Sequence, residues 1–461
     1  MLNSPEPEGD ATPATGVPTG FLANVNVVFL SQIVIYGLAF VLRVLLAQGL
    51  GDSGLGTYSL FFIAVLVAGG IANLGVGLGN IYFLNRGDYS YGTLLSGSLF
   101  VLAVSTVVAW LAVGAWGLIH GDELFVEGAA YWWYAAALPA VVAYVLLTSF
   151  LHGESRFLAL SSIAIIQGLT GVVIAAVLYA FDELDILGAI IAFTLAFLIA
   201  DVICLAVVVA GRLDIGGILR PHFRILGAQI RYGAQGQIAN LAQLFNYRLD
   251  QFLVAAFVSR AGVGHYSVAV GLSESVWWIS SAVAMVLLPR LTGMDRQRAA
   301  EVTPVICRNT LTVSIAAAAG LVVVSPLAIR VLFGSQFDPA LLPLVLLMPG
   351  IIAASATRVL GSYLFSQGHI IYNTYATFIA LGVTLALDFA LIPWLKVEGA
   401  AIASSFAYTC SLVATLAWYR QVSGGGIGEA LLVRASDMEL YSSVVPRAFG
   451  RSDARAGDEA P

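Results

Sequence analysis

The sequence contains very few charged residues. Only 10% of its 461 residues are Asp, Glu, Lys or Arg, whereas 59% are hydrophobic. A water-soluble domain carries roughly 25% charged residues, so most of this chain cannot face water. Lysine occurs once, as Lys396, and cysteine three times, as Cys204, Cys307 and Cys410. The three cysteines have no close-spaced partner, which argues against a disulfide framework or a zinc site.

Enzyme signatures are also missing. The chain has no Gly-x-Ser-x-Gly elbow, and Lys396 lies in no phosphate-binding loop. The histidines are scattered without metal-ligand spacing, at His120, His152, His222, His265 and His369. The net charge of −6 belongs to loops and tails, and the basic residues form no stripe for nucleic acid. We therefore expect no catalytic residue, no cofactor, no metal site and no nucleic-acid partner.

Long apolar runs recur from end to end of the chain. A helix of about 20 apolar residues crosses a hydrocarbon core, and no barrel-like alternation is present. The sequence thus predicts an all-α integral membrane protein with about twelve transmembrane helices. The predicted spans are 24–49, 55–84, 91–118, 129–151, 157–181, 186–210, 233–258, 263–289, 307–333, 340–365, 370–395 and 398–420.

The basic residues predict the orientation of these spans. With a cytoplasmic N-terminus, only Arg260, Arg330 and Lys396 fall on the outer side. Residues 1–22 contain no Lys or Arg and are expected to be a disordered tail rather than a secretory signal. The positive-inside rule therefore places both termini in the cytoplasm. The inner side would hold Arg86, Arg156, Arg212, Arg220, Arg224, Arg231, Arg290, Arg296, Arg298, Arg308, Arg420, Arg434, Arg447, Arg451 and Arg455.

A short motif occurs twice, about half a chain apart. GLGTYSL spans Gly54–Leu60, and GVGHYSV spans Gly262–Val268. GAIIAFTLAF, from Gly188, similarly resembles GAAIASSFAY, from Gly399. The repeat relates the first predicted span to the seventh, so both copies would cross the membrane in the same direction. We expect two pseudo-symmetric six-helix lobes built as parallel repeats. The predicted parts are a tail at 1–22, lobes at 23–210 and 233–420, a cytoplasmic amphipathic linker at 211–232 and a cytoplasmic tail at 421–461.

Two stretches around these motifs resemble a known family. They are RVLLAQGLGDSGLGTYSLFFIAVLVAGGIANLGVGLG, from Arg43, and NYRLDQFLVAAFVSRAGVGHYSVAVGLSESVWWISSAVAMVLLPRL, from Asn246. Both are similar to oligosaccharide-lipid flippases of the Wzx type. These flippases form the polysaccharide-transporter branch of the multidrug/oligosaccharidyl-lipid/polysaccharide exporter superfamily.

The resemblance implies a function and a set of partners. It implies a flippase of the cytoplasmic membrane that moves polyprenyl-diphosphate-linked oligosaccharide by rocking two lobes around a central cavity. Its partners would be the lipid-linked glycan, membrane lipids and the glycan polymerase or glycosyltransferase machinery. Two alternatives within the superfamily remain, a multidrug cation antiporter and a flippase for the peptidoglycan lipid precursor. The first span contains no acidic residue, which argues against the antiporter. The embedded charges are a mixture of acidic and basic residues, which argues against the peptidoglycan-precursor flippase, because that branch tends to have a strongly cationic cavity.

Polar residues within the spans are the candidate site residues. An ionisable group inside a membrane is costly, which makes it a functional candidate. The seventh span carries polar residues at helical spacing, and the first span carries a matching set at the repeat offset. We expect the two helices to face each other across the cavity. The predicted substrate-binding residues are Gln32, Tyr36, Arg43, Gln237, Asn240, Gln243, Tyr247, Arg248 and Arg358, and the predicted coupling or gating residues are Asp250 and Glu274.

Further expectations concern individual residues. The arginines would meet the diphosphate, and the amides of the seventh span would meet sugar hydroxyls. Asp250 is expected to pair with Arg43 across the cleft when the outer side is shut. Asp388 is the remaining embedded acid of the second lobe, and lies either in the bundle or at the membrane interface. Gly75 and Gly79 form a small-xxx-small pair, which predicts close helix packing.

Overall fold

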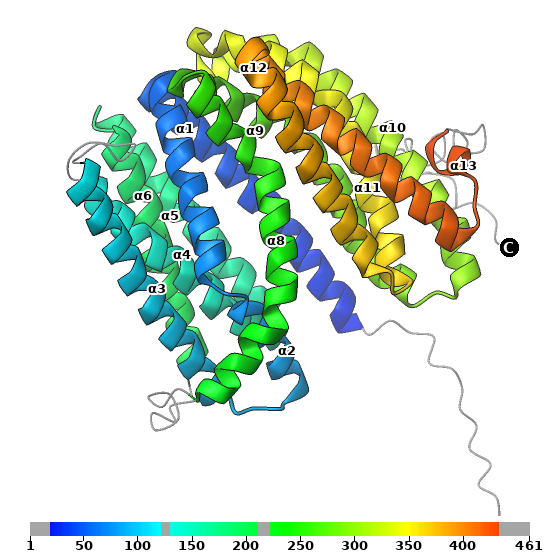
Figure 1. The fold of residues 1–461 in the computed structure, drawn as a ribbon, viewed down its shortest axis with the longest axis horizontal. Coiled ribbons are helices and arrows are strands. Elements are labelled where there is room, and N and C mark those ends of the chain that lie inside the picture. Colours follow the sequence, from blue (N-terminus) through cyan, green and yellow to red (C-terminus); the bar gives the residue numbers. More distant parts are fainter. Residues whose placement is uncertain (1–18, 121–129, 211–221, 433–461) are drawn as a thin grey trace, which may run out of the picture.

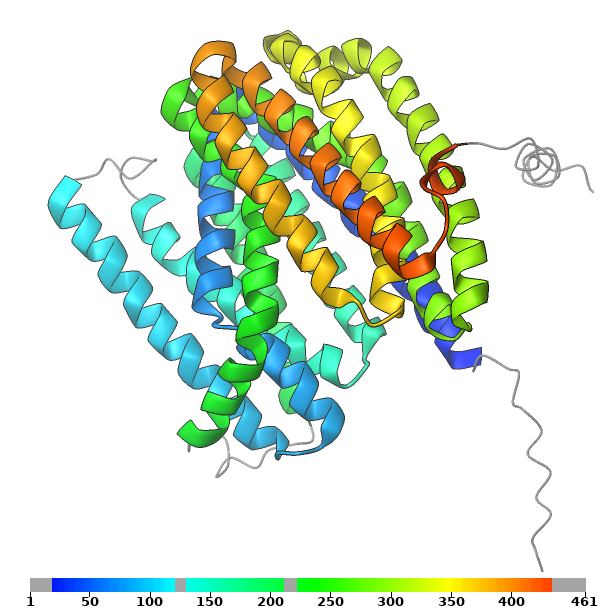
Figure 2. The ribbon, with the colours of Figure 1, turned by 45° about the vertical axis from the view of Figure 1, so that its right-hand side comes forward.

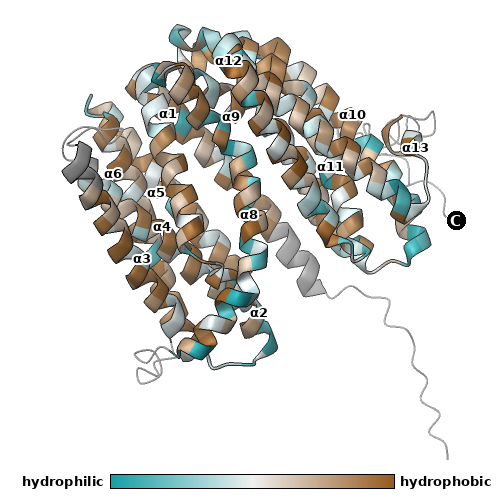
Figure 3. Ribbon diagram, viewed as in Figure 1, coloured by the Kyte–Doolittle hydropathy of each residue, from teal (hydrophilic) through white to brown (hydrophobic). Residues whose placement is uncertain are grey.

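The computed structural model describes residues 19–120, 130–210 and 222–432, and every regular element in these ranges is a helix. Nine of the described helices are long and apolar enough to cross a membrane. Figure 3 shows apolar residues along most of their length and hydrophilic residues gathered toward their ends. The chain is therefore an all-helical, multi-pass membrane protein. The helices are α1 (Thr19–Ala72), α2 (Val76–Arg86), α3 (Tyr91–His120), α4 (Ala130–Gly153), α5 (Phe157–Ala180), α6 (Ile186–Val209), α8 (Phe223–Phe257), α9 (Arg260–Thr292), α10 (Arg296–Ala328), the π-helix η1 (Ile329–Phe333), the 3₁₀-helix η2 (Ser335–Ala340), α11 (Leu341–Ser366), α12 (Ile370–Ser423) and α13 (Ile427–Leu431).

The helices form two groups, which we name the N-terminal group (α1–α6) and the C-terminal group (α8–α13) (Figure 1). Within the first group, α1 packs on α5, and α4 packs on α2, α3 and α6. Within the second, α11 packs on α9, α10 and α12, and α8 packs on α12. The main contacts between the groups are those of α1 with α9 and of α2 with α8. The groups converge at one end of the molecule and separate at the other, in both views (Figures 1 and 2).

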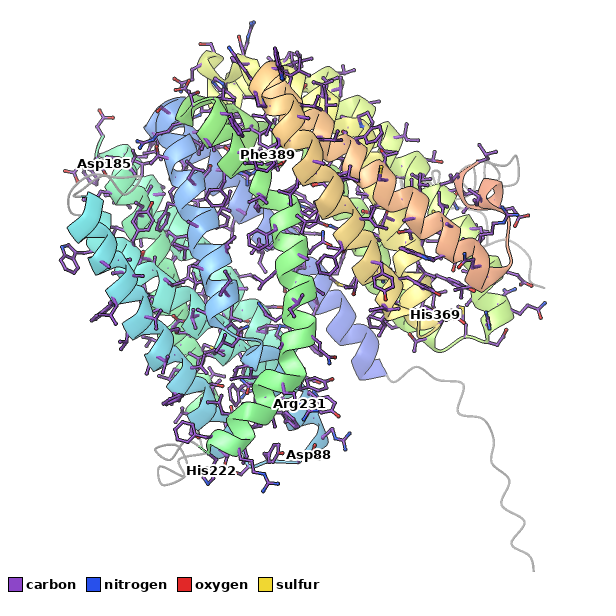
Figure 4. All side chains as sticks on the ribbon, viewed as in Figure 1. Asp88, Asp185, His222, Arg231, His369 and Phe389 are labelled. Carbon is purple, nitrogen blue, oxygen red and sulfur yellow. The ribbon has the colours of Figure 1, made fainter. Side chains whose placement is uncertain are left out.

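The buried apolar residues show the same asymmetry. At the converging end, which we name the joined end, one continuous cluster includes Leu46 and Leu55 of α1 as well as Val263 and Tyr266 of α9. Toward the other end, the separated end, each group has an apolar cluster of its own. Figure 4 places Asp185 and Phe389 at the joined end, and Asp88, His222 and His369 at the separated end. The two groups are thus sealed together at the joined end in this structure.

The repeated heptapeptides meet each other at the joined end. A Cβ atom added to Gly56 would lie 1.8 Å from the carbonyl oxygen of Arg260, and one added to Gly264 would lie 2.0 Å from that of Asp52. Such distances leave no room for any side chain, so α1 and α9 touch backbone to backbone. The Nε2 atom of His265 also lies 3.2 Å from a carboxylate oxygen of Asp52. The glycines of both copies of the motif are therefore needed for this closure.

A second backbone contact joins α8 to α2. A Cβ at Gly233 would lie 1.8 Å from the carbonyl oxygen of Gly75, and one at Gly79 would lie 2.6 Å from that of Gln229. The Gln229 amide, fully buried, donates to Oδ1 of Asn80 at 2.6 Å. The close packing predicted for Gly75 and Gly79 is confirmed, and its partner is the first half of α8.

The start of α8 differs from the expected boundary. Residues 211–221 of the predicted amphipathic linker lie outside the described residues, but residues 223–232 are the first turns of α8. Leu226 and Gln229 are buried there, against α2 and α3. This part of the chain is therefore an extension of the seventh predicted span that packs on the N-terminal group. Most of the two predicted tails, residues 1–18 and 433–461, also lie outside the described residues.

Two long helices are broken where the predicted spans end. In α1 the break is Gly51 (φ 69°, ψ −173°), and in α12 it is Lys396 (φ 53°, ψ −129°). Glycine adopts a positive φ without steric cost, whereas lysine does not. The break in α12 therefore stores backbone strain, and the break in α1 does not.

This contrast predicts opposite effects of two substitutions on stability. Lys396→Gly should release strain of about 1–3 kcal/mol, partly offset by a greater entropy loss on folding of about 0.5–1 kcal/mol. We expect a net stabilisation and a higher midpoint of thermal unfolding for the purified protein in detergent. Gly51→Ala, the matched control, should lower that midpoint. A lower midpoint for Lys396→Gly would contradict the assignment of strain to this position.

Candidate functional site

Three embedded charges meet where α1, α8 and α9 come together. Arg248 of α8 forms a salt bridge with Glu274 of α9, with 2.9 Å between Nη2 and Oε1. Arg43 of α1 lies against Gly271 of α9, so closely that a Cβ at Gly271 would be 1.2 Å from its Nη1. Gly271 and Glu274 are three residues apart and share one face of α9. An arginine of the N-terminal group therefore lies about one helical turn from the Arg248–Glu274 pair. We name these three residues the charge triad.

Asp250 does not belong to this triad. Its Oδ2 accepts hydrogen bonds from the hydroxyls of Tyr266 (2.5 Å) and Ser404 (3.2 Å), and its Oδ1 accepts one from the backbone of Gln251 (2.8 Å). The expected pair between Asp250 and Arg43 is not formed, although the joined end is closed. The reason is direction: Asp250 is two residues from Arg248 on α8 and so faces α12 rather than α1.

Asp388 of α12 lies in the interior beside Asp250. Its side chain is fully buried, and neither of its carboxylate oxygens has a hydrogen-bond partner among the described residues. Four residues earlier on the same two helices, Thr384 of α12 donates a hydrogen bond to Asn246 of α8 at 3.1 Å, which places Asp388 and Asp250 one turn further along the same contact. The structure thus excludes the interfacial position that the sequence left open for Asp388. It also brings together two acids whose proximity the sequence did not indicate, because they are 138 residues apart.

A cavity of about 460 Å³ opens within the C-terminal group. Of the predicted substrate-binding residues, Gln243, Tyr247 and Arg358 line it. Arg358 donates to the Ser281 hydroxyl at 2.8 Å, and its guanidinium lies 4.8 Å from the ring centre of Trp277. The remaining lining residues are Asn246, Trp277, Ala284, Leu288, Ala354, Thr357, Gly361, Ser362, Phe365, Asn373, Ala376, Thr377, Ala380, Tyr408 and Ser411.

The other predicted residues are distributed around this cavity. The Gln237 amide donates to the carbonyl of Gly70 at 2.7 Å and so ties α8 to α1. Tyr36 stacks on Trp278 of α9, with 4.7 Å between ring centres. Gln32 is half-buried and Asn240 is exposed, and neither lines the cavity. The polar face expected on the seventh span is therefore divided between a contact with α1 and the interior of the C-terminal group.

The sequence did not indicate several of the residues that line the cavity. Asn246 is three residues from Gln243, so helical spacing could have found it. It accepts a hydrogen bond from Thr384 at 3.1 Å. Trp277, Asn373 and Thr377 come from helices that showed no polar stripe, and no signal in the sequence distinguished them from packing residues. Thr377 donates to the Gln243 amide oxygen at 2.9 Å and thereby completes one wall of the cavity.

Comparisons with known proteins find sequence relatives for part of the chain and a shared fold for most of it. Residues 127–342 match the family model described as polysaccharide biosynthesis protein. A curated relative, named as a probable low-salt glycan biosynthesis flippase from Haloferax volcanii, is 23% identical over 198 residues. That match covers 42% of this chain and 42% of the relative, so less than half of the relative's length is represented.

Two solved structures share the fold over nearly the whole chain. One is a lipid II flippase, MurJ, in an inward closed conformation, with a TM-score of 0.70, 12% identity and 94% of each chain covered. The other is a multidrug resistance MATE transporter in an inward-facing conformation, with a TM-score of 0.61, 15% identity and coverage of 85% of this chain and 94% of that one. The resemblance that the sequence motifs indicate, to the flippases of the multidrug/oligosaccharidyl-lipid/polysaccharide exporter superfamily, is therefore confirmed.

Proposed function

We propose that the chain is a flippase that moves a polyprenyl-diphosphate-linked oligosaccharide across the cytoplasmic membrane by alternating access. The two helix groups would be the two lobes, each crossing the membrane six times, with both termini in the cytoplasm. In this arrangement the joined end faces outward and the separated end faces the cytoplasm. The arginines expected on the inner side include Arg86 and Arg231. Figure 4 shows Arg231 and Asp88 near the separated end, and Arg86 forms an ion pair with Asp88 at 3.0 Å.

The observation that carries this proposal is the charge triad. Arginine binds phosphate through a planar fork of donors, and its charge is retained even in a membrane. Arg43 and Arg248 come from different helix groups and meet at α9, where Glu274 pairs with Arg248 and lies about one helical turn from the contact of Arg43 with Gly271. A diphosphate offers more negative charge than Glu274 and could replace it between the two arginines. Substrate binding would thus exchange an internal ion pair for a substrate contact at the junction of the lobes.

The sequence relatives favour a glycan substrate over the two alternatives. The family model and the curated relative are both named for polysaccharide or glycan biosynthesis. The similarity to the lipid II flippase and to the MATE transporter rests on 12% and 15% identity, and so concerns the fold. The amides and hydroxyls that line the cavity, such as Gln243, Asn246 and Asn373, also suit the hydroxyl groups of sugars.

Asp250 and Asp388 are proposed as the coupling site, with Glu274 as the gate. Two neighbouring carboxylates inside a membrane require a cation or a shared proton, since two uncompensated charges would be very costly there. The hydroxyls of Tyr266 and Ser404 hold Asp250 in place by hydrogen bonds. Both carboxylate oxygens of Asp388 lack a hydrogen-bond partner among the described residues and could bind a cation. Uptake of a cation at this pair would let an ion gradient drive the change between the two states of the lobes.

A leaflet assay tests the proposed function. Purified protein in vesicles should move a polyprenyl-diphosphate oligosaccharide between leaflets, measured by enzymatic labelling of glycans on the outer face. An imposed proton or sodium gradient should accelerate this movement, and Asp388→Asn should remove the acceleration. Thr384→Ser, on the same helix, serves as a control. If the protein moves lipid II or a cationic drug but no oligosaccharide lipid, the proposed substrate class is wrong.

A further inference from the structure

Arg358 differs from Arg43 and Arg248 because it lines the cavity of the C-terminal group. It is the single charged residue among those that line the cavity of about 460 Å³. Among the described residues, no salt bridge joins Arg358 to a carboxylate, whereas Arg248 pairs with Glu274 at 2.9 Å. It contacts three neutral groups: the Ser281 hydroxyl at 2.8 Å, the Tyr247 hydroxyl at 3.5 Å and the ring of Trp277.

This arrangement holds the guanidinium in place without neutralising its charge. The ring of Trp277 covers it, and two neutral hydroxyls bind it at two nitrogens. A guanidinium has five N–H donors, so donors remain for a further ligand. A positive charge inside a membrane without a counter-charge is costly, and such residues mark substrate pathways. The cavity is therefore suited to a ligand that brings its own negative charge.

Arg358 and the charge triad occupy different sites. Arg358 lines the cavity within the C-terminal group, whereas none of Arg43, Arg248 and Glu274 lines it. Arg43 and Arg248 lie instead where α1 of the N-terminal group meets α8 and α9. A diphosphate held by Arg43 and Arg248 would therefore bind at this junction, outside the cavity. The negative charge that meets Arg358 must then belong to another part of the substrate.

The other residues that line the cavity indicate which part of the substrate carries this negative charge. Amides of Gln243, Asn246 and Asn373 and hydroxyls of Thr357 and Thr377 surround the cavity, next to the aromatic rings of Trp277 and Tyr408. Amides and hydroxyls bind sugar hydroxyls, and aromatic faces provide apolar contact area. We propose that this cavity is a subsite for an acidic sugar of the glycan, such as a uronate or a sulfated hexose, with Arg358 binding its carboxylate or sulfate. This inference rests on the proposed function and adds a substrate class to it.

Binding of small soluble probes tests the subsite directly. Calorimetry on the full-length purified protein would compare a glucuronic acid disaccharide, a glucose 6-sulfate disaccharide and the neutral glucose disaccharide. We expect the wild-type protein to bind at least one acidic disaccharide at least ten-fold more tightly than the neutral one. Arg358→Gln should remove this preference, and Arg358→Lys should keep part of it because the charge remains. Equal affinity for acidic and neutral sugars in the wild type would overturn the proposal.

A second ligand separates this inference from the proposed function. Geranyl diphosphate carries a diphosphate without a sugar, so its binding should depend on Arg43 and Arg248 and remain unchanged in Arg358→Gln. If Arg358→Gln weakens geranyl diphosphate as much as it weakens the acidic sugar, Arg358 is a diphosphate ligand and the acidic-sugar subsite is wrong. If geranyl diphosphate binds equally well to the wild type and to the Arg43 and Arg248 variants, the proposed diphosphate site is wrong. The acidic-sugar subsite is then still tested separately, by the affinities of the acidic and neutral disaccharides. Unchanged thermal unfolding of both Arg358 variants would show that they are folded.

Discussion

Replacing both Arg43 and Arg248 by alanine should abolish export of the lipid-linked glycan while leaving the protein in the membrane. Each arginine is proposed to bind the diphosphate, and a hydrogen bond to a charged group contributes about 1.5–3 kcal/mol. Since about 1.4 kcal/mol corresponds to a factor of ten, each single variant should lose about ten- to a hundred-fold in transport. The measurement is the amount of lipid-linked glycan reaching the outer leaflet of cells whose only copy of the gene carries the variant.

The charge triad also predicts how partial replacements should behave. Lysine at either position should rescue part of the transport, because a point charge still attracts phosphate but lacks the bidentate fork. Glu274→Gln would leave Arg248 without its carboxylate partner and would remove the negative charge near Arg43. Losing one partner of a buried pair costs about 3–5 kcal/mol. The protein should then bind diphosphate more tightly but release it slowly. Normal surface glycan in the Arg43→Ala, Arg248→Ala double variant would rule out the proposed diphosphate site.

Alanine at Gly56 or Gly264 should prevent the joined end from closing. The added Cβ would lie 1.8 Å from the carbonyl oxygen of Arg260 or 2.0 Å from that of Asp52, and both obstacles are backbone atoms. Overpacking costs about 1–3 kcal/mol even where side chains can adjust, and a backbone cannot adjust as easily. A free-energy change of this size would change the ratio of closed to open protein by about five- to a hundred-fold. Transport should fall because the protein can no longer reach the state in which the joined end is closed.

Cysteine labelling from outside the cell would measure this effect. In a variant lacking Cys204, Cys307 and Cys410, a probe cysteine at Gln243 in the cavity should react with an impermeant maleimide only when the joined end opens. We expect strong labelling with Gly264→Ala and weak labelling without it. Gly320→Ala is the matched control, because a Cβ at Gly320 would meet no atom within 4 Å. Equal labelling in the Gly264 and Gly320 variants would show that the glycine contact does not control closure.

The sequence predicted the fold where the signal was local. Apolar runs predicted membrane-spanning helices, and the polar interruptions near Gly51 and Lys396 coincide with the breaks in α1 and α12. The repeated heptapeptide predicted an equivalence between distant segments, and its glycines form the contact at the joined end. These features could be predicted because each is recognised within a short stretch of sequence, even where two copies of that stretch lie far apart in the chain.

The contacts between charged residues could not be predicted in the same way. Helical spacing shows that Arg248 and Asp250 point in different directions, but it does not show which residue of α9 or α12 each one meets. The rotation and height of one helix relative to another depend on side-chain packing along their whole lengths. The partner of Arg248 is therefore Glu274, and Asp250 binds Tyr266 and Ser404 instead of Arg43. The beginning of α8 was misjudged for a related reason, since its arginines resemble those of a surface linker.

The packing of α8 has a consequence for the order in which the chain assembles. During synthesis the N-terminal group emerges first, yet its Gly75 and Gly79 surface has no cover until α8 arrives. Its buried Asn80 likewise lacks the donor that Gln229 provides at 2.6 Å. An unmet buried acceptor costs about 1–3 kcal/mol, so the first half of the nascent chain has an incomplete interior. The first turns of α8 complete the interior of the N-terminal group. The rest of the C-terminal group is then synthesised after a helix that is already packed on the N-terminal group.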